Sequence, residues 1–371
     1  MPAYDAFLLL SFGGPEGPDD VLPFLENVTR GRGVPRERLA DVAGHYHAFG
    51  GVSPINAQCR DLLTAAGAAF AAGGIDLPLY WGNRNWQPFI GDTVRQMKAD
   101  GIQRAIAFVT SAYSSYSACR QYLDDIDRAV AAAGPGAPRV DKSRPYFNHP
   151  GFIEPFAAAA ETALAGLPAG ARAGARLVFT AHSVPVGMAA ASGSPSRGTA
   201  VPDAVGGRYA AELREASRLI SERVRGGTLP YDLVFQSRSG PPGAPWLEPD
   251  VNDHLTGLAK GTLTSGEPVP VPSAVVVVPV GFVSDHMEVV HDLDTEAART
   301  AASLGLPFAR AKAPGPTPRF AEMIRELVEE RVSGAEPKAL GNFGLGAFAD
   351  GADSCPADCC RYSPARPGRP A

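Results

Sequence analysis

Residues 274–282 read Ala-Val-Val-Val-Val-Pro-Val-Gly-Phe and contain the strongest β-strand signal in the chain. A β-branched run without polar alternation is typical of a strand that is buried on both faces, as strands are in parallel sheets. Parallel strands are joined by helices that cover the sheet, so we expect strands and helices to alternate along the chain.

Seven other short apolar runs, separated by helical patterns, fit this alternation. The eight expected strands are Ala6–Phe12, Leu77–Trp81, Arg104–Thr110, Arg139–Asp141, Arg176–Ala181, Asp232–Gln236, Ala274–Val280 and Pro307–Ala311. Helical patterns include Asp92–Asp100, Glu154–Leu164, Arg208–Val224 and Arg319–Val332. Four strands in each half predict an α/β fold of two similar doubly wound lobes, each a four-stranded parallel sheet flanked by helices. We expect the lobes at 1–145 and 146–335, followed by a C-terminal extension at 336–371 that ends in a disordered tail.

The composition indicates a globular protein and argues against a nucleic-acid-binding or membrane-anchored one. The chain has 371 residues, enough for two lobes of roughly 150 residues each, and 45% of its residues are apolar. It carries 34 basic and 39 acidic residues, a net charge of −5, without a long basic block, so we expect no nucleic-acid partner. We see neither a signal peptide nor eighteen consecutive apolar residues, and therefore expect a cytoplasmic protein without a stable membrane anchor.

His182 is the first candidate for chemistry, because it follows the apolar run 177–181 and so stands at the end of a strand. Ligands of open parallel sheets bind beyond the carboxyl ends of the strands. A neutral imidazole there can accept a proton or bind a divalent metal near neutral pH. The alternative is a partly buried histidine that hydrogen-bonds to backbone.

Glu288 is the second candidate, since it lies just beyond the 274–280 strand. With Asp285 as N-cap and Glu288 at the third helical position, the segment has the pattern of a capping box. Capping does not account for Asp292 and Glu296, which an α-helix would place on the same face as Glu288, with His291 and Asp294 nearby. A solvated acidic face is one interpretation, and a track for cations or protons towards the strand end is the other.

Three of the five cysteines crowd the tail, in Cys355-Pro356-Ala357-Asp358-Cys359-Cys360. Cytosolic thiols stay reduced, so a metal site is a better explanation than a disulfide framework. A [2Fe–2S] cluster is usually held by four thiolates. A structural zinc ion accepts the same ligands, and free thiols without a metal are the third option. The fourth ligand would come from Cys119 or Cys59.

Taken together, these motifs resemble the ferrochelatase family. The matching segments, in chain order, are Ser11-Phe12-Gly13-Gly14-Pro15, Gly50-Gly51-Val52-Ser53-Pro54-Ile55, Ala181-His182-Ser183-Val184-Pro185, Gln236-Ser237-Arg238 with Pro245-Trp246-Leu247, and residues 279–288. The likeness runs from about residue 5 to about residue 335. It implies a lyase of haem biosynthesis that inserts ferrous iron into a porphyrin held in a cleft between the lobes.

The resemblance also implies roles for the acidic and histidine candidates. His182 corresponds to the family's catalytic histidine and Glu288 to the glutamate opposite it, and Asp292 and Glu296 match an outward acidic row on a distorted helix. Imidazole and carboxylate are reasonable transient ligands for the substrate Fe²⁺, because neither holds it as tightly as thiolate does. Glu16 stands where some relatives have a tyrosine that can ligate the metal from the other face.

The porphyrin substrate would be a flat apolar ring with acidic side chains. Arg30 and Arg32 are candidates to pair with its carboxylates, and Ser53 and Tyr122, which match porphyrin-contacting positions, to donate hydrogen bonds. Aromatic candidates for the apolar walls are Phe12, Trp81, Tyr113, Tyr116 and Trp246, although core packing is the default for such residues.

The tail resembles that of actinobacterial ferrochelatases, in which a [2Fe–2S] cluster is held by three tail cysteines and one internal cysteine. This implies Cys119, Cys355, Cys359 and Cys360 as ligands and leaves Cys59 spare. Actinobacterial relatives act on coproporphyrin III to give Fe-coproporphyrin (coproheme), whereas members from eukaryotes and many other bacteria use protoporphyrin IX. The resemblance therefore implies coproporphyrin III here, with protoporphyrin IX as the alternative, and a hand-over of product to the next enzyme of the haem pathway. The rival functions are a non-catalytic tetrapyrrole-binding or iron–sulfur sensor protein and a chelatase for cobalt or nickel.

Overall fold

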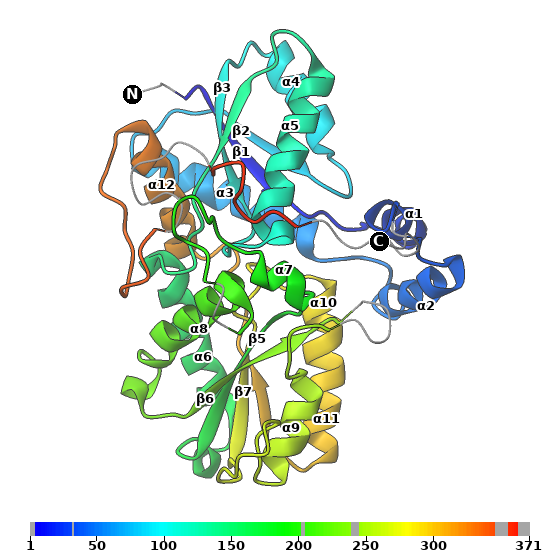
Figure 1. The fold of residues 1–371 in the computed structure, drawn as a ribbon, viewed down its shortest axis with the longest axis vertical. Helices are drawn as coiled ribbons and strands as arrows, with labels where there is room; N and C mark the ends of the chain where they lie inside the picture. The colour runs from blue at the N-terminus through cyan, green and yellow to red at the C-terminus, as the bar shows by residue number, and fades with distance from the viewer. Residues whose placement is uncertain (1–3, 32, 202–204, 239–244, 346–354, 363–371) are drawn as a thin grey trace.

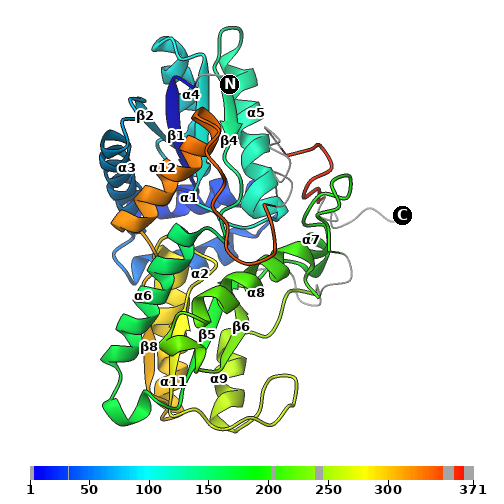
Figure 2. The ribbon, with the colours of Figure 1, turned by 90° about the vertical axis from the view of Figure 1, so that its left-hand side faces the viewer.

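The computed structural model describes residues 4–31, 33–201, 205–238, 245–345 and 355–362 and confirms the predicted fold. Two parallel four-stranded sheets lie one above the other, each between helices (Figures 1 and 2). The first sheet has the order β2-β1-β3-β4 and the second β6-β5-β7-β8. The strands are β1 (Ala6–Ser11), β2 (Leu79–Asn83), β3 (Arg104–Val109), β4 (Arg139–Lys142), β5 (Ala175–His182), β6 (Tyr231–Gln236), β7 (Ala274–Val278) and β8 (Phe308–Arg310).

The helices follow the predicted alternation, with two π-helical segments that the sequence patterns do not predict. The α-helices are α1 (Val21–Val28), α2 (Arg36–His47), α3 (Ile55–Ala72), α4 (Ile90–Ala99), α5 (Gln121–Ala133), α6 (Pro150–Gly166), α7 (Val186–Ala190), α8 (Gly207–Ser221), α9 (Val251–Ala259), α10 (Met287–Val289), α11 (Ala298–Ser303) and α12 (Pro318–Val332). The π-helices are η2 (Tyr116–Arg120) and η5 (Val290–Ala297). π-helical turns are rare and often occur at functional sites.

The valines of β7 are buried on both faces of their sheet, as the sequence predicts. Val276 and Val278 belong to the core beneath α6 and α8, whereas Val275 and Val277 belong to the core beneath α9 and α11. Burying each such side chain stabilises the fold by roughly 1.5–3 kcal/mol. The strand ends at Val278, two residues earlier than predicted, because Pro279 has no N–H to continue the ladder.

The last helix ties the two lobes together. Helix α12 packs on α6 of the second lobe and on α3 of the first (Figure 2), and one continuous apolar core includes Phe70 of α3, Phe179 of β5 and Phe320 of α12. The lobes therefore fold around a shared core. The predicted boundaries at 145 and 335 stay predictions, and most of the predicted disordered tail lies outside the described residues.

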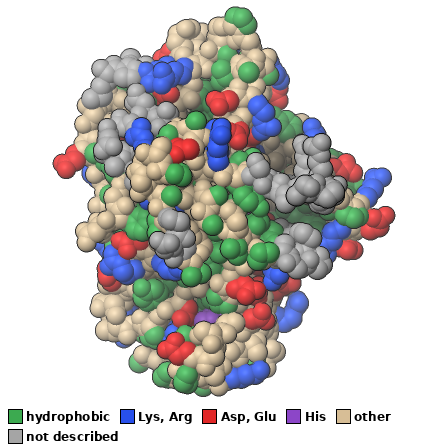
Figure 3. Space-filling view, viewed as in Figure 1, with side chains coloured by type: hydrophobic (Ala, Val, Ile, Leu, Met, Phe, Trp, Pro, Cys, Tyr) green, Lys and Arg blue, Asp and Glu red, His purple; other side chains and the backbone are tan. Residues whose placement is uncertain are grey.

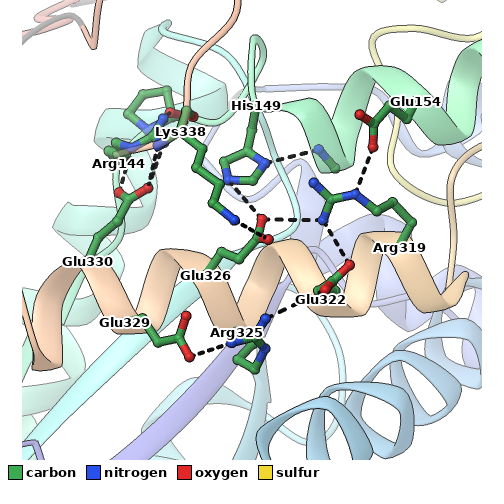
Figure 4. A network of polar contacts seen from close by, with 12 residues as sticks. Arg144, His149, Glu154, Arg319, Glu322, Arg325, Glu326, Glu329, Glu330 and Lys338 are labelled. Carbon is green, nitrogen blue, oxygen red and sulfur yellow. Dashed lines mark hydrogen bonds and ion pairs between the residues drawn. The ribbon is translucent and has the colours of Figure 1, made fainter. Parts of the chain in front are cut away.

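A buried ion-pair network strengthens this joint (Figure 4). Arg144, just after β4, makes a bidentate pair with Glu330 of α12, with N–O distances of 2.7 and 2.8 Å, and both side chains are buried. Nearby, Glu326 accepts from Arg319 and Lys338 and lies 3.4 Å from Nε2 of His149. Burial and the neighbouring cations lower the pKa of His149 to about 2, so this histidine is neutral and acts as the N-cap of α6.

The face of the molecule shown in Figure 3 has acidic and basic side chains interspersed, and apolar side chains gather across its middle. A single-sign basic patch, which nucleic-acid binding needs, is not seen on this face. Among the described residues, we find no helix that is both long and apolar enough to cross a membrane.

Breaking the buried pair should destabilise the protein far more than breaking a surface pair. We expect Glu330→Met to lower the free energy of unfolding by about 3–5 kcal/mol, because Arg144 keeps a buried charge without its carboxylate. The matched control is Asp92→Asn, which breaks the exposed Asp92–Arg95 pair and should cost less than about 1 kcal/mol. Urea unfolding followed by circular dichroism measures both, and equal small losses would contradict the structural role of the buried pair.

Candidate active site

His182 and Glu288 face each other where the two lobes meet. His182 is the last residue of β5, and its Nε2 atom lies 3.7 Å from Oε1 of Glu288, which belongs to α10. About a third of the His182 side chain and nearly half of that of Glu288 are exposed, so the pair is open to an incoming ligand. The Nδ1 atom of His182 contacts the Ser183 carbonyl, and the Tyr209 hydroxyl donates to the His182 carbonyl at 2.9 Å.

A glycine lets the chain after β7 pass close to β5 and so brings Glu288 towards His182. The Gly281 N–H donates to the Thr180 carbonyl at 3.0 Å. A Cβ atom at position 281 would lie 2.6 Å from both Cα and Cβ of Ala181, too close for any side chain. The glycine of the Val280-Gly281-Phe282 motif is therefore required by packing.

The predicted capping box at Asp285 is wrong. The N-cap of α10 is His286, whose Nδ1 atom accepts from the Glu288 N–H at 3.1 Å. Asp285 instead pairs with Arg310 at 2.7 Å, and its backbone makes two hydrogen bonds with the Gln58 amide of α3. A contact between lobes, which a local pattern cannot show, thus replaces the local cap and fixes the segment that carries Glu288.

The acidic row lies on the π-helix η5 and not on the regular α-helix that its spacing suggests. The Asp292 carboxylate accepts from the Gln236 amide at 3.2 Å and from the Ser237 hydroxyl. Ligand atoms of His291, Asp292 and Glu296 lie within 4.8 Å of one another, close enough to hold one cation. Asp294 points elsewhere and pairs with Arg310.

Helix α2 of the first lobe and the turn after it supply residues that the sequence patterns do not single out. The His45 ring stacks on that of His291 with centroids 4.1 Å apart, and Phe49 makes an edge contact with the same ring. Burial and the charges of Glu288 and Asp292 raise the pKa of the Tyr46 hydroxyl well above its usual range. These contacts join residues far apart in the chain, and no local spacing signals them.

Each member of the His182–Glu288 pair stabilises the charged form of the other. Burial alone would lower the pKa of His182, but the carboxylate of Glu288 beside it raises this pKa to about 9. Burial would likewise raise the pKa of Glu288, but the positive charge of His182 lowers it to about 2. Near neutral pH the pair is therefore an imidazolium and a carboxylate when no ligand is bound.

The porphyrin candidates occupy different surroundings. Arg30, which follows α1, is exposed. Phe12 is partly exposed and packs edge-on against Phe24. Ser53 and Tyr122 are buried. The Arg84 guanidinium lies over the Tyr122 ring, 4.8 Å from its centroid. None of the four candidates makes a hydrogen bond or ion pair with His182 or Glu288.

The remaining candidates divide between core and surface. Tyr113 is fully buried, and its hydroxyl donates to the Val280 carbonyl across the lobes, whereas Trp81, Tyr116 and Trp246 are half-buried. Glu16, which stands in place of a tyrosine, pairs with Arg60 at 2.5 Å. Arg32 lies outside the described residues.

Four of the five thiols meet at a second site. Cys119 in η2 lies within hydrogen-bonding reach of Cys355, as Cys355 does of Cys359, and the sulfur atoms of Cys359 and Cys360 are 3.8 Å apart. Cys59 is absent from this group and is buried in α3, where burial raises its pKa to about 11. The tail segment is held by Asp358, which accepts hydrogen bonds from Ser194 and Ser196.

Comparisons with known proteins agree with this geometry. Residues 4–332 match the family model described as ferrochelatase. A coproporphyrin III ferrochelatase of Nocardia farcinica is 53% identical over 370 residues, covering 99% of this chain and 100% of that one. Another of Streptomyces griseus is 52% identical over 374 residues, covering 99% and 95%. Among solved structures, SirB from Bacillus subtilis with Fe³⁺ superposes with a TM-score of 0.51 at 12% identity, covering 95% and 99%, which supports the fold alone.

The pKa of His182 should depend on Glu288. We expect Glu288→Gln to bring this pKa from about 9 to 6.5 or lower, because the carboxylate stabilises the protonated ring and burial opposes it. Asp292→Asn is the control and should lower the pKa less, since Asp292 makes the smaller contribution. NMR titration of histidine-labelled, metal-free protein measures both variants. An unchanged pKa in Glu288→Gln would show that the charge of Glu288 does not act on His182.

Proposed function

The chain belongs to the ferrochelatase family, and we propose that it is a lyase that inserts Fe²⁺ into coproporphyrin III to give Fe-coproporphyrin in haem biosynthesis. The observation that carries this proposal is the His182–Glu288 pair, which combines a proton acceptor and a carboxylate at 3.7 Å. Insertion must remove two protons from pyrrole nitrogens and supply a dication in their place. Imidazole and carboxylate suit these two tasks.

We propose that His182 takes the pyrrole protons and that Glu288 receives the metal and passes protons outwards. In the ligand-free pair His182 already carries a proton, since its pKa is about 9. A dication bound near Glu288 screens the carboxylate and so removes the charge that keeps the ring protonated. His182 then gives up its proton, which leaves past Glu288 to solvent, and the neutral ring can accept a pyrrole proton at Nε2. A second round of release and acceptance removes the second pyrrole proton. Metal arrival and proton acceptance are coupled in this way through one ion pair.

The acidic row is the proposed route of the substrate Fe²⁺ towards this pair. Asp292 and Glu296, with His291, offer two carboxylates and an imidazole, ligands that hold ferrous iron without the tight binding of thiolates. The Gln236 and Ser237 hydrogen bonds orient Asp292 for this task. On the porphyrin side, we propose that Arg30 pairs with a carboxylate of the substrate, Ser53 and Tyr122 donate hydrogen bonds, and Phe12 contacts the ring.

We also propose that Cys119, Cys355, Cys359 and Cys360 hold a [2Fe–2S] cluster. The donor set fits, because Cys119, Cys355 and Cys359 line one small cavity with Arg208, and the Cys360 sulfur lies 3.8 Å from that of Cys359. The Nη2 atom of Arg208 is buried and has no hydrogen-bond partner among the described residues, as expected if an acceptor belongs in that cavity. A bound cluster would supply a one-electron redox centre and link the tail to η2. We further propose a cytoplasmic location and a hand-over of product to the next enzyme of the pathway.

Anaerobic turnover with Fe²⁺ tests the substrate and the catalytic histidine together. We expect a clear preference for coproporphyrin III over protoporphyrin IX. His182→Ala should lower kcat at least about 100-fold, the usual contribution of a general base, and should leave porphyrin binding and the melting temperature nearly unchanged.

A preference for protoporphyrin IX would keep the chemistry and overturn the proposed substrate. Turnover of neither porphyrin by a cluster-loaded sample would favour the sensor protein. Retained turnover in His182→Ala would remove that residue from its proposed role.

The cluster ligands can be tested with two serine substitutions. After anaerobic reconstitution we expect Cys119→Ser to lose most of the visible absorption and iron of the cluster, because one of four thiolates is gone. Cys59→Ser is the matched control and should keep both, since Cys59 is buried apart from the other thiols. Zinc bound in place of iron and sulfide by the unsubstituted protein would identify the rival structural zinc site.

A further inference from the structure

Arg208 is a buried arginine that keeps one hydrogen-bond donor without an acceptor. It lies in the first turn of α8, is 5% exposed and lines the thiol cavity, the small cavity that Cys119, Cys355 and Cys359 also line. Its Nη2 atom is buried and has no hydrogen-bond partner among the described residues. Leaving a buried donor unpaired is costly, so an acceptor bound in the thiol cavity would account for this atom. The family motifs in the sequence do not include Arg208.

The rest of the Arg208 guanidinium group is held in place. Its Nε atom donates to Glu212 at 2.6 Å, and Nη1 donates to the Thr199 carbonyl at 3.0 Å. The group also lies over the Phe343 ring, 4.9 Å from its centroid. Because a guanidinium group is planar, these contacts fix the direction of the remaining Nη2 atom. Arg208 therefore offers a preorganised N–H donor whose charge is already paired with that of Glu212.

The Arg208–Glu212 pair is anchored to the segment that carries the internal cysteine. The Glu212 side chain is fully buried and accepts from the Ser114 N–H at 2.6 Å and from the Ser114 hydroxyl at 2.8 Å. Ser114 lies five residues before Cys119 and also lines the thiol cavity. Arg208, on the second lobe, is thus positioned through Glu212 against the first-lobe segment that supplies Cys119.

A backbone N–H group already donates to sulfur at this site. The Gly193 N–H donates to the Cys360 sulfur at 3.3 Å, and the Cys360 N–H donates back to the Gly193 carbonyl at 2.7 Å. Position 193 needs glycine, because its φ is +95° and a Cβ atom there would lie 2.6 Å from the Thr199 carbonyl oxygen. Hydrogen bonds to sulfur are one means by which proteins set the potential of iron–sulfur clusters.

We propose that Arg208 donates a hydrogen bond from Nη2 to a sulfur atom of the bound cluster and thereby raises its reduction potential. This inference rests on the proposed [2Fe–2S] cluster. With four thiolates the cluster carries two negative charges when both irons are ferric. It carries three after taking up one electron, and no bond to iron forms or breaks. The sulfur atoms accept hydrogen bonds more strongly in the more negative, reduced state, so the donor stabilises that state more.

A paired substitution separates the hydrogen bond from net charge. Arg208→Met combined with Glu212→Gln removes the donor together with its partner, leaves the summed charge unchanged and keeps an oxygen for the Ser114 N–H. The matched control, Arg218→Met with Glu215→Gln, removes a pair with two N–O distances of 2.8 Å from the same helix, and neither residue lines the thiol cavity.

Anaerobic redox titration of the reconstituted proteins, with dithionite as electron donor, measures the effect. We expect the Arg208/Glu212 variant to shift the equilibrium about tenfold towards the oxidised state, which is about 59 mV for a one-electron couple. The Arg218/Glu215 variant should keep the potential of the unsubstituted protein. An unchanged potential in the Arg208/Glu212 variant would overturn the proposal.

Pulsed electron paramagnetic resonance tests the hydrogen bond itself. In protein labelled with ¹⁵N-arginine, the reduced cluster should show a hyperfine coupling to an arginine nitrogen, and the control variant should keep this coupling. Its absence from the unsubstituted protein would overturn the proposal, even if the Arg208/Glu212 variant lost its cluster. Absence of a cluster from the unsubstituted protein would instead refute the proposed cofactor, and absorption and iron content distinguish that result from the others.

Discussion

The close approach of Gly281 to the end of β5 is the constraint on which the active site depends. The parallel pairing of β5 with β7 places the ends of both strands side by side, and a residue without a side chain lets the chain leaving β7 cross over Ala181. His182 is the next residue of β5, so the segment that crosses there delivers Glu288 to the imidazole. A larger residue at position 281 would have to move this segment, and Glu288 would move with it relative to His182.

The segment after the crossing is held from the first lobe and not by its own helix cap. Gln58 bonds to both backbone groups of Asp285, and Arg310 pairs with its carboxylate. Glu288 then sits on a helix of only three residues that continues into the π-helix η5. The wider turn lets the ligand atoms of Asp292 and Glu296 gather with those of His291, although like charges four residues apart repel by a few tenths of a kcal/mol.

Sequence patterns predict the fold well because the sheets are buried on both faces. The apolar run of β5 and the β-branched run of β7 both predict buried strands, and all eight strands lie within about two residues of their predicted bounds. Local patterns fail to predict an interaction when its partner lies far away in the sequence. Asp285 has the sequence signature of an N-cap, but its backbone N–H donates to the Gln58 side chain of the first lobe. His45 contacts His291 only because the two lobes lie against each other. Spacing alone likewise leaves Cys59 and Cys119 equivalent. The family resemblance points to Cys119, and the fold places Cys119, and not Cys59, beside the tail cysteines.

The two sites share one helix, which limits how independently they can move. On α8, the Tyr209 hydroxyl bonds to the His182 carbonyl, while the preceding residue, Arg208, lines the thiol cavity. The Tyr209 N–H also bonds to the Ser192 hydroxyl, next to the Gly193 backbone that contacts Cys360. A shift of α8 that opened the thiol cavity would therefore pull on the backbone of the catalytic strand. Arg208, Tyr209 and Ser192 are buried, and closely packed interiors transmit displacements, so a movement of α8 would reach both sites.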